Sequence, residues 1–132
     1  MYPDLYSKAL GIIRSAYGEG AEFREGQYEA IESTLTHHRT LVVQKTGWGK
    51  SLVYFVCTKL LRESGHGVTF VVSPLLALME NQLQAAAAFG LCGVVLNSAT
   101  KESRAGDLEL IKSGQCDLFR YDILFIVEVN KI

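Results

Sequence analysis

The chain has 132 residues, which is the length of one domain of ordinary size. Hydrophobic residues make up 48% of it and charged residues 20%, a composition that excludes a disordered chain. The formal net charge of −1 excludes a strongly basic surface, so any contact with nucleic acid has to be made locally.

Two helices are predicted at the start of the chain. Apolar residues recur at helical spacing over residues 4–17, and a loop of glycines and glutamates follows. The second helix is predicted to open at Phe23 and to run to about Thr36. Its first turns contain Gln27, whose amide can pair with the N6 and N7 edge of adenine, and Arg24 can bond nearby. A single glutamine on a helix is usually solvated, so this interpretation depends on the motif that follows.

A strand at residues 40–44 is predicted to lead into a glycine-rich loop and then into a helix from Lys50 to about Leu61. This order of strand, loop and helix is the one that a phosphate-binding loop (P-loop) requires. Glycines accept a positive φ and let backbone N–H groups turn toward a phosphate, while the start of the helix adds unpaired donors. The loop residues assigned to nucleotide binding are Thr46, Gly47, Trp48, Gly49, Lys50 and Ser51.

Two of these residues carry the predicted chemistry. Lys50 supplies a point charge for the β- and γ-phosphates and is the predicted catalytic residue, and Ser51 supplies a hydroxyl ligand for Mg²⁺. Gln44 stands where the strict P-loop pattern has its first glycine, and the run Thr-Gly-x-Gly-Lys-Ser resembles the form of the loop that helicases have. The alternative is a plain turn with a solvated lysine, which the flanking strand and helix disfavour.

The rest of the chain alternates strands with helices. Strands are predicted at residues 68–72, 93–96 and 121–127, and helices at residues 75–89 and 101–112. This order predicts an α/β fold with a parallel sheet and right-handed crossovers. Ligands of such sheets bind at the carboxyl ends of the strands, so Ser73-Pro74 and Asn97-Ser98 are candidate contacts, although each can also be a plain turn or helix start.

The three cysteines have no metal-ligand spacing, and we expect them to be reduced thiols of a cytoplasmic protein. The N-terminus has no secretory signal pattern, and no apolar run reaches the length that spans a membrane. We therefore expect no membrane partner.

Taken together, the motifs resemble those of RecQ-type DNA helicases, superfamily-two enzymes that unwind DNA in the 3′-to-5′ direction with ATP. The resemblance covers roughly residues 10–126. It rests on four segments in the family's order, at residues 23–31, 46–51, 72–82 and 96–98. The resemblance implies a P-loop NTPase with an incomplete RecA-like parallel sheet at residues 39–132, preceded by helices with an adenine-recognition motif at residues 1–38.

The family motifs imply roles residue by residue. Phe23, Arg24 and Gln27 match the motif that recognises adenine, and the P-loop residues match the ATP and Mg²⁺ site. A second set matches segments that lie along single-stranded DNA in relatives: Ser73, Pro74, Asn81, Gln82, Asn97 and Ser98. Hydroxyls, amides and backbone N–H groups can hold phosphates there without a basic surface.

The sequence also departs from the family pattern. An aromatic residue that precedes the Phe-Arg pair in the family has only Tyr17 as its counterpart, one residue too far away, so the role of Tyr17 stays open. No Asp-Glu-Ala-His motif and no second RecA-like domain are present, and we expect a truncated binding segment of limited stability that lacks full hydrolysis. The alternative is a non-enzymatic module that binds nucleotide or single-stranded DNA and pairs with a separate chain for hydrolysis.

Overall fold

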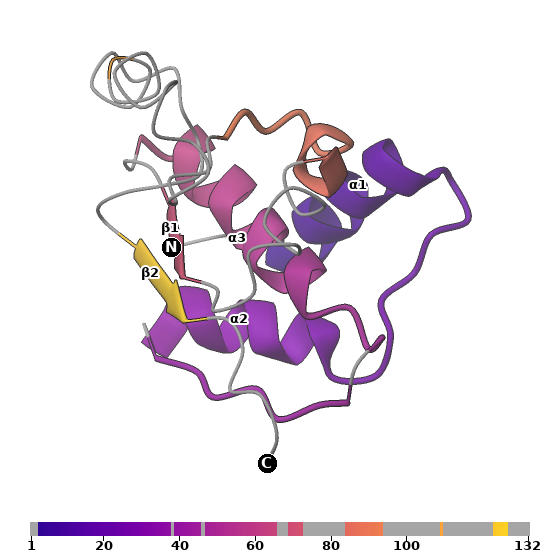
Figure 1. Cartoon of the computed structure of the whole chain (residues 1–132). Helices are drawn as coiled ribbons and strands as arrows, with labels where there is room; N and C mark the ends of the chain where they lie inside the picture. Colours follow the sequence, from indigo (N-terminus) through magenta and orange to yellow (C-terminus); the bar gives the residue numbers. More distant parts are fainter. Residues whose placement is uncertain are drawn as a thin grey trace.

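The computed structural model describes residues 3–37, 39–45, 47–65, 69–72, 84–93, 109 and 123–126. Their elements follow the order α1 (Leu5–Tyr17), α2 (Gln27–His37), α3 (Lys50–Glu63), β1 (Thr69–Val72) and β2 (Ile123–Ile126). In Figure 1, α3 runs through the middle of the molecule, with the two strands on one side and α1 on the other. The predicted α1 and α3 are confirmed, and α3 extends two residues beyond its predicted end.

The central position of α3 follows from its sequence. Residues 52–58 are all buried, as are Leu60 and Leu61, so this helix is apolar on nearly every side. It packs against both α1 and α2. Burial of Cys57 in this helix raises the pKa of its thiol, which keeps the group protonated at neutral pH.

The two N-terminal helices complete this core from one side. Ala9 and Ile13 are the buried residues of α1, one helical turn apart, and Ile31 and Leu35 have the same spacing on α2. The apolar faces predicted from periodicity are therefore the faces that pack. Residues of the two predicted segments, 1–38 and 39–132, contribute to one hydrophobic cluster. The division between these segments stays a prediction.

The predicted start of the second helix at Phe23 is wrong, because α2 begins at Gln27. Gly26 has a φ of 87°, a conformation that interrupts a right-handed helix. The backbone N–H of Gln27 bonds to the carbonyl of Arg24, which closes a tight turn immediately before the helix. Residues 23–26 thus form a separate segment with its own direction, and this segment reaches the P-loop.

The two described strands pair in parallel, as the predicted α/β topology requires. Thr69 lies opposite Ile123 and Val72 lies opposite Ile126. The strands are separated by about fifty residues of sequence and still lie side by side, which is the expected result of a crossover connection. Thr69 is tied to α3 by a hydrogen bond of 2.6 Å between its Oγ1 and that of Thr58.

The strand predicted at residues 40–44 is not formed. Residues 39–45 have no strand hydrogen bonding, and Leu41 and Val43 are 81% and 61% exposed. Val42, between them, packs against the core. The β-type residues that favoured a strand are present, but Leu41 and Val43 have no covering layer among the described residues.

The helix predicted at residues 75–89 is described only in its last part. Residues 84–87 are helical, and Gly90 follows with a φ of 72°. The N–H of Leu91 bonds to the carbonyl of Ala86 and the N–H of Gly90 to that of Ala87, which is the Schellman arrangement of a helix end. Gly90 thus ends this helix, directly after the predicted end at residue 89. Within the described ranges, no helix is long and apolar enough to cross a membrane.

Candidate nucleotide-binding site

The P-loop has the backbone geometry that its glycines predict. Gly47 has a φ of 91° and Gly49 a φ of 96°, and α3 begins immediately afterwards at Lys50. Gly49 caps α3 without a side-chain hydrogen bond, so the first N–H groups of the helix are not satisfied by a capping side chain. These donors and the positive end of the helix dipole lie at one place, which suits a bound phosphate.

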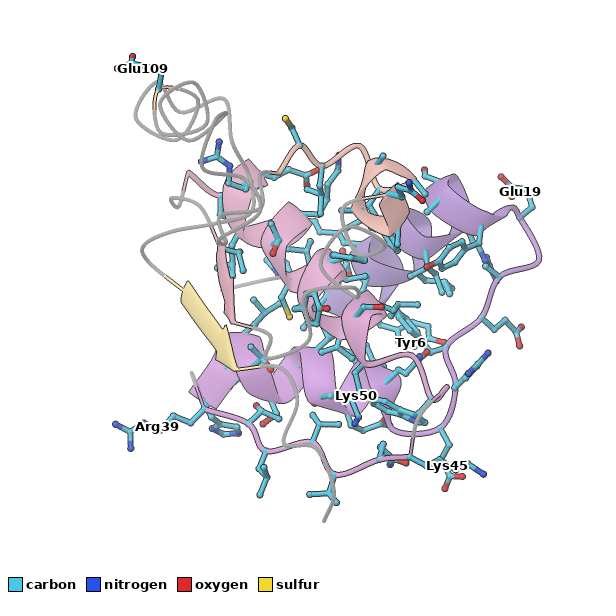
Figure 2. All side chains as sticks on the ribbon, viewed as in Figure 1. Tyr6, Glu19, Arg39, Lys45, Lys50 and Glu109 are labelled. Atoms are coloured by element: carbon cyan, nitrogen blue, oxygen red, sulfur yellow. The ribbon has the colours of Figure 1, made fainter. Side chains whose placement is uncertain are left out.

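Two loop side chains with predicted chemistry stand at the start of α3. Lys50 and Ser51 are both partly exposed. Figure 2 places Lys50 at the start of α3, inside the loop, whereas Lys45 on the other side of the loop extends outward. Thr46 lies outside the described residues, and its predicted role stays a prediction.

Gln27 is buried, with 2% of its surface exposed, and its amide faces the P-loop. Its Nε2 donates to the carbonyl oxygens of Trp48 at 2.9 Å and Gly49 at 3.3 Å. Its Oε1 accepts from the backbone N–H of Arg24 at 2.8 Å. The interpretation of Gln27 as a solvated surface residue is therefore wrong, because this side chain joins the start of α2 to the P-loop.

Two more hydrogen bonds join the same segments. Nη1 of Arg24 donates to the carbonyl oxygen of Gly47, and Nε1 of Trp48 donates to the carbonyl oxygen of Glu25 at 2.9 Å. We call the hydrogen bonds between residues 24–27 and residues 47–49 the P-loop clip. The clip brings the predicted adenine-recognition residues and the predicted phosphate-binding loop into direct contact.

The model of the DEAD/DEAH box helicase family matches residues 24–125 of this chain. The chain belongs to the DEAD/DEAH box helicase family. The matched range begins at the first residue of the P-loop clip and covers every motif downstream of it. This family match implies a RecA-like P-loop fold, of which the described residues show the P-loop, α3 and one parallel strand pair.

Individual relatives confirm the resemblance to RecQ-type helicases. The ATP-dependent DNA helicase RecQ of Haemophilus influenzae is 37% identical over 111 residues, which are 83% of this chain and 17% of that protein. The ATP-dependent DNA helicase Q-like 5 of Arabidopsis thaliana is 35% identical over 103 residues, 78% of this chain and 11% of the relative. The ATP-dependent helicase SGS1 of Saccharomyces cerevisiae is 34% identical over 97 residues, 73% of this chain and 7% of the relative. The chain thus spans less than a fifth of the length of these relatives.

The donor groups of the P-loop in this helicase-family chain suit a nucleoside triphosphate and Mg²⁺. A Cβ added to Gly49 would lie 2.5 Å from Nε2 of Gln27, so only glycine fits where the loop passes this amide. Lys50 and Ser51 would hold the phosphates and the metal ion, respectively, with an ammonium group and a hydroxyl oxygen. These donor types are the ones that ATP and Mg²⁺ require.

Phe23 lies in an aromatic cluster that the sequence did not reveal. Its ring is 6.0 Å from that of Tyr6 and 5.9 Å from that of Tyr28, and the Tyr6 and Tyr28 rings are 4.9 Å apart. Tyr6 comes from α1 and is half exposed. The helix predicted at residues 4–17 includes Tyr6, but nothing in the sequence indicated that this residue meets Phe23.

Tyr17 lies against Phe89 in the structure, and its role stays open. The ring of Tyr17 packs edge-on against Phe89 at 5.3 Å, and its partial burial raises the pKa of its hydroxyl. The predicted DNA-contacting residues lie outside the described residues and stay predictions: Ser73, Pro74, Asn81, Gln82, Asn97 and Ser98.

Proposed function

We propose that this chain is the ATP-binding and nucleic-acid-binding N-terminal segment of an ATP-dependent DNA helicase of the RecQ type, with 3′-to-5′ polarity. The observation that supports this most directly is the P-loop clip, in which Arg24 and Gln27 bond to the carbonyls of the phosphate-binding loop. A structural turn alone would need no buried glutamine between two segments twenty residues apart. A nucleotide has a base and phosphates, and the clip joins the residues proposed for each.

Each part of the nucleotide has proposed partners. Phe23, Arg24 and Gln27 recognise adenine, and Gly47, Gly49 and the first N–H groups of α3 bind the phosphates. Lys50 stabilises negative charge on the β- and γ-phosphates, and Ser51 ligates Mg²⁺. The 132 residues contain no Asp-Glu-Ala-His sequence, so we infer that the groups that orient the attacking water come from elsewhere.

Single-stranded DNA is the proposed second ligand. The relatives carry the words DNA helicase in their names, and the family match covers the segments that contain Ser73 and Asn97. Their hydroxyl and amide groups suit phosphate oxygens of a strand without requiring a basic surface. This agrees with the net charge of −1 for the chain.

Substitution of Lys50 tests the nucleotide site. Lys50→Ala removes a charge-assisted contact to phosphate, which corresponds to about a ten- to hundredfold loss of MgATP affinity. The affinity is measured by isothermal titration calorimetry on the purified chain. Lys45→Ala is the matched control, because Lys45 is exposed and points away from the loop. Equal affinities for MgATP in both variants and in the unsubstituted chain would refute the proposed function.

A further inference from the structure

The residue between the two P-loop glycines is Trp48, and it is the one tryptophan of the chain. Its indole Nε1–H donates to the carbonyl oxygen of Glu25 at 2.9 Å. Its ring lies against Gly26, where an added Cβ would be 3.5 Å from the Cζ2 atom of the indole. The ring is partly buried and packs on the core. This large side chain therefore extends back across the segment that precedes α2.

The Trp48 hydrogen bond differs from the rest of the P-loop clip in the atoms that it uses. Both amide hydrogens of Gln27 face carbonyl oxygens of the loop, so donation to adenine requires that Gln27 release one of them. The bond to Gly49 is the longer one, at 3.3 Å. The bond from Trp48 to Glu25 uses no atom of Gln27 and no backbone N–H of the loop. It can hold the two segments together while Gln27 exchanges partners.

We propose that Trp48 is a positioning residue that couples base recognition to phosphate binding. Its indole fixes residues 25–27 at a set position relative to Gly47 and Gly49, so that a nucleotide bound through its phosphates meets the adenine-recognition residues without further rearrangement. Pre-organisation of this kind raises affinity by removing the cost of ordering the two segments on binding. This inference rests on the proposed function, since it requires that the P-loop bind a nucleotide.

Two ligands separate coupling from a general effect on the loop. MgATP carries a base, whereas magnesium tripolyphosphate presents the phosphates alone. In Trp48→Phe an aromatic ring remains and the N–H donor is lost. Loss of one hydrogen bond of ordinary strength corresponds to about a two- to tenfold weaker affinity for MgATP. We expect this loss for MgATP and less than about a twofold change for tripolyphosphate, both measured by calorimetry.

The ratio of the two affinities decides the outcome. A lower ratio of MgATP to tripolyphosphate affinity in Trp48→Phe supports the coupling. Equal losses for both ligands, or no loss for either, overturn it, because Trp48 would then only support the loop or have no role. If Trp48→Phe does not fold, the isosteric analogue benzothienylalanine, which has sulfur in place of the indole N–H, replaces this single tryptophan in the same comparison. Failure of the unsubstituted chain to bind MgATP would instead refute the proposed function itself.

Discussion

Gly49 is the most constrained residue of the site. Its φ of 96° is a conformation that other residues adopt only with strain, and a Cβ there would collide with Nε2 of Gln27 at 2.5 Å. Displacement of the amide by a Cβ would break its hydrogen bonds to the loop, because Gln27 is buried and bonded at both ends. Backbone strain and side-chain collision therefore both disfavour any residue other than glycine at position 49.

Gly49→Ala is expected to lower the free energy of unfolding by about 2–4 kcal/mol, from left-handed strain plus the lost amide hydrogen bonds. Gly47→Ala separates the two effects, because Gly47 has a φ of 91° and open space around it, so only the strain of about 1–2 kcal/mol remains. Gly11→Ala is the opposite control: Gly11 lies inside α1 with nothing near it, and alanine there is expected to stabilise by about 0.5–1 kcal/mol. Urea denaturation measures the change in the free energy of unfolding for all three variants. Equal changes for Gly47→Ala and Gly49→Ala would contradict a collision between the new Cβ and Gln27.

At the residue scale, the sequence predicted which residues form the site but not how they meet. The spacing of Thr-Gly-x-Gly-Lys-Ser predicted two glycines with positive φ and a helix starting at Lys50, because these properties are local. The contact of Gln27 with Trp48 and Gly49 joins positions more than twenty apart in the chain. It depends on how α2 packs against α3, and no local pattern carries that information.

At the scale of elements, the helices were predicted well and their junctions less well. The helical spacing of its apolar residues identifies α1, whereas α3 is identified by its apolar run directly after the P-loop glycines. The start of α2 was misplaced because Phe23 continues the apolar pattern, while the backbone of Gly26 breaks the helix. The order of elements predicted a parallel sheet, and β1 and β2 do pair in parallel, but which strands are neighbours was not predicted.

The attachment of α3 to β1 depends on two buried hydroxyls. Thr58 and Thr69 are both 0% exposed, and their Oγ1 atoms are 2.6 Å apart. A buried hydroxyl without a partner costs more than a pair of apolar groups of the same shape. The two threonines therefore act as a unit, and their effects on stability should not be additive.

Thr58→Val alone leaves the hydroxyl of Thr69 without its Thr58 partner and is expected to cost about 1–3 kcal/mol. The double variant Thr58→Val/Thr69→Val removes both hydroxyls and is expected to cost less than the sum of the two single changes. Thr34→Val is the control: its hydroxyl bonds to the Ala30 carbonyl within α2, and its loss is expected to cost within about 0.5 kcal/mol. Chemical denaturation of the four variants gives the coupling energy, and strict additivity would contradict the pairing.

At the scale of the whole molecule, the candidate nucleotide-binding site lies beside the hydrophobic core. The core combines α1, α2 and α3 with Ala86, Phe89 and Leu91, and the P-loop clip joins the first residues of α2 and α3 beside it. Rigid helices thus hold two loop segments against each other. This arrangement places the residues proposed to bind a nucleotide on fixed supports, as precise binding requires.

The segment at residues 39–45 is where the predicted and observed molecules differ most, and stability measurements can decide between them. In a buried sheet, Leu41 and Val43 would each cost about 2–5 kcal/mol when truncated. In the structure they are 81% and 61% exposed, so Leu41→Ser/Val43→Ser is expected to change the free energy of unfolding by less than about 1 kcal/mol. Val42→Ser is the matched control, because Val42 packs on the core, and it is expected to cost more than both outer changes together. A large loss in the double variant would mean that the predicted strand forms and that other residues cover it.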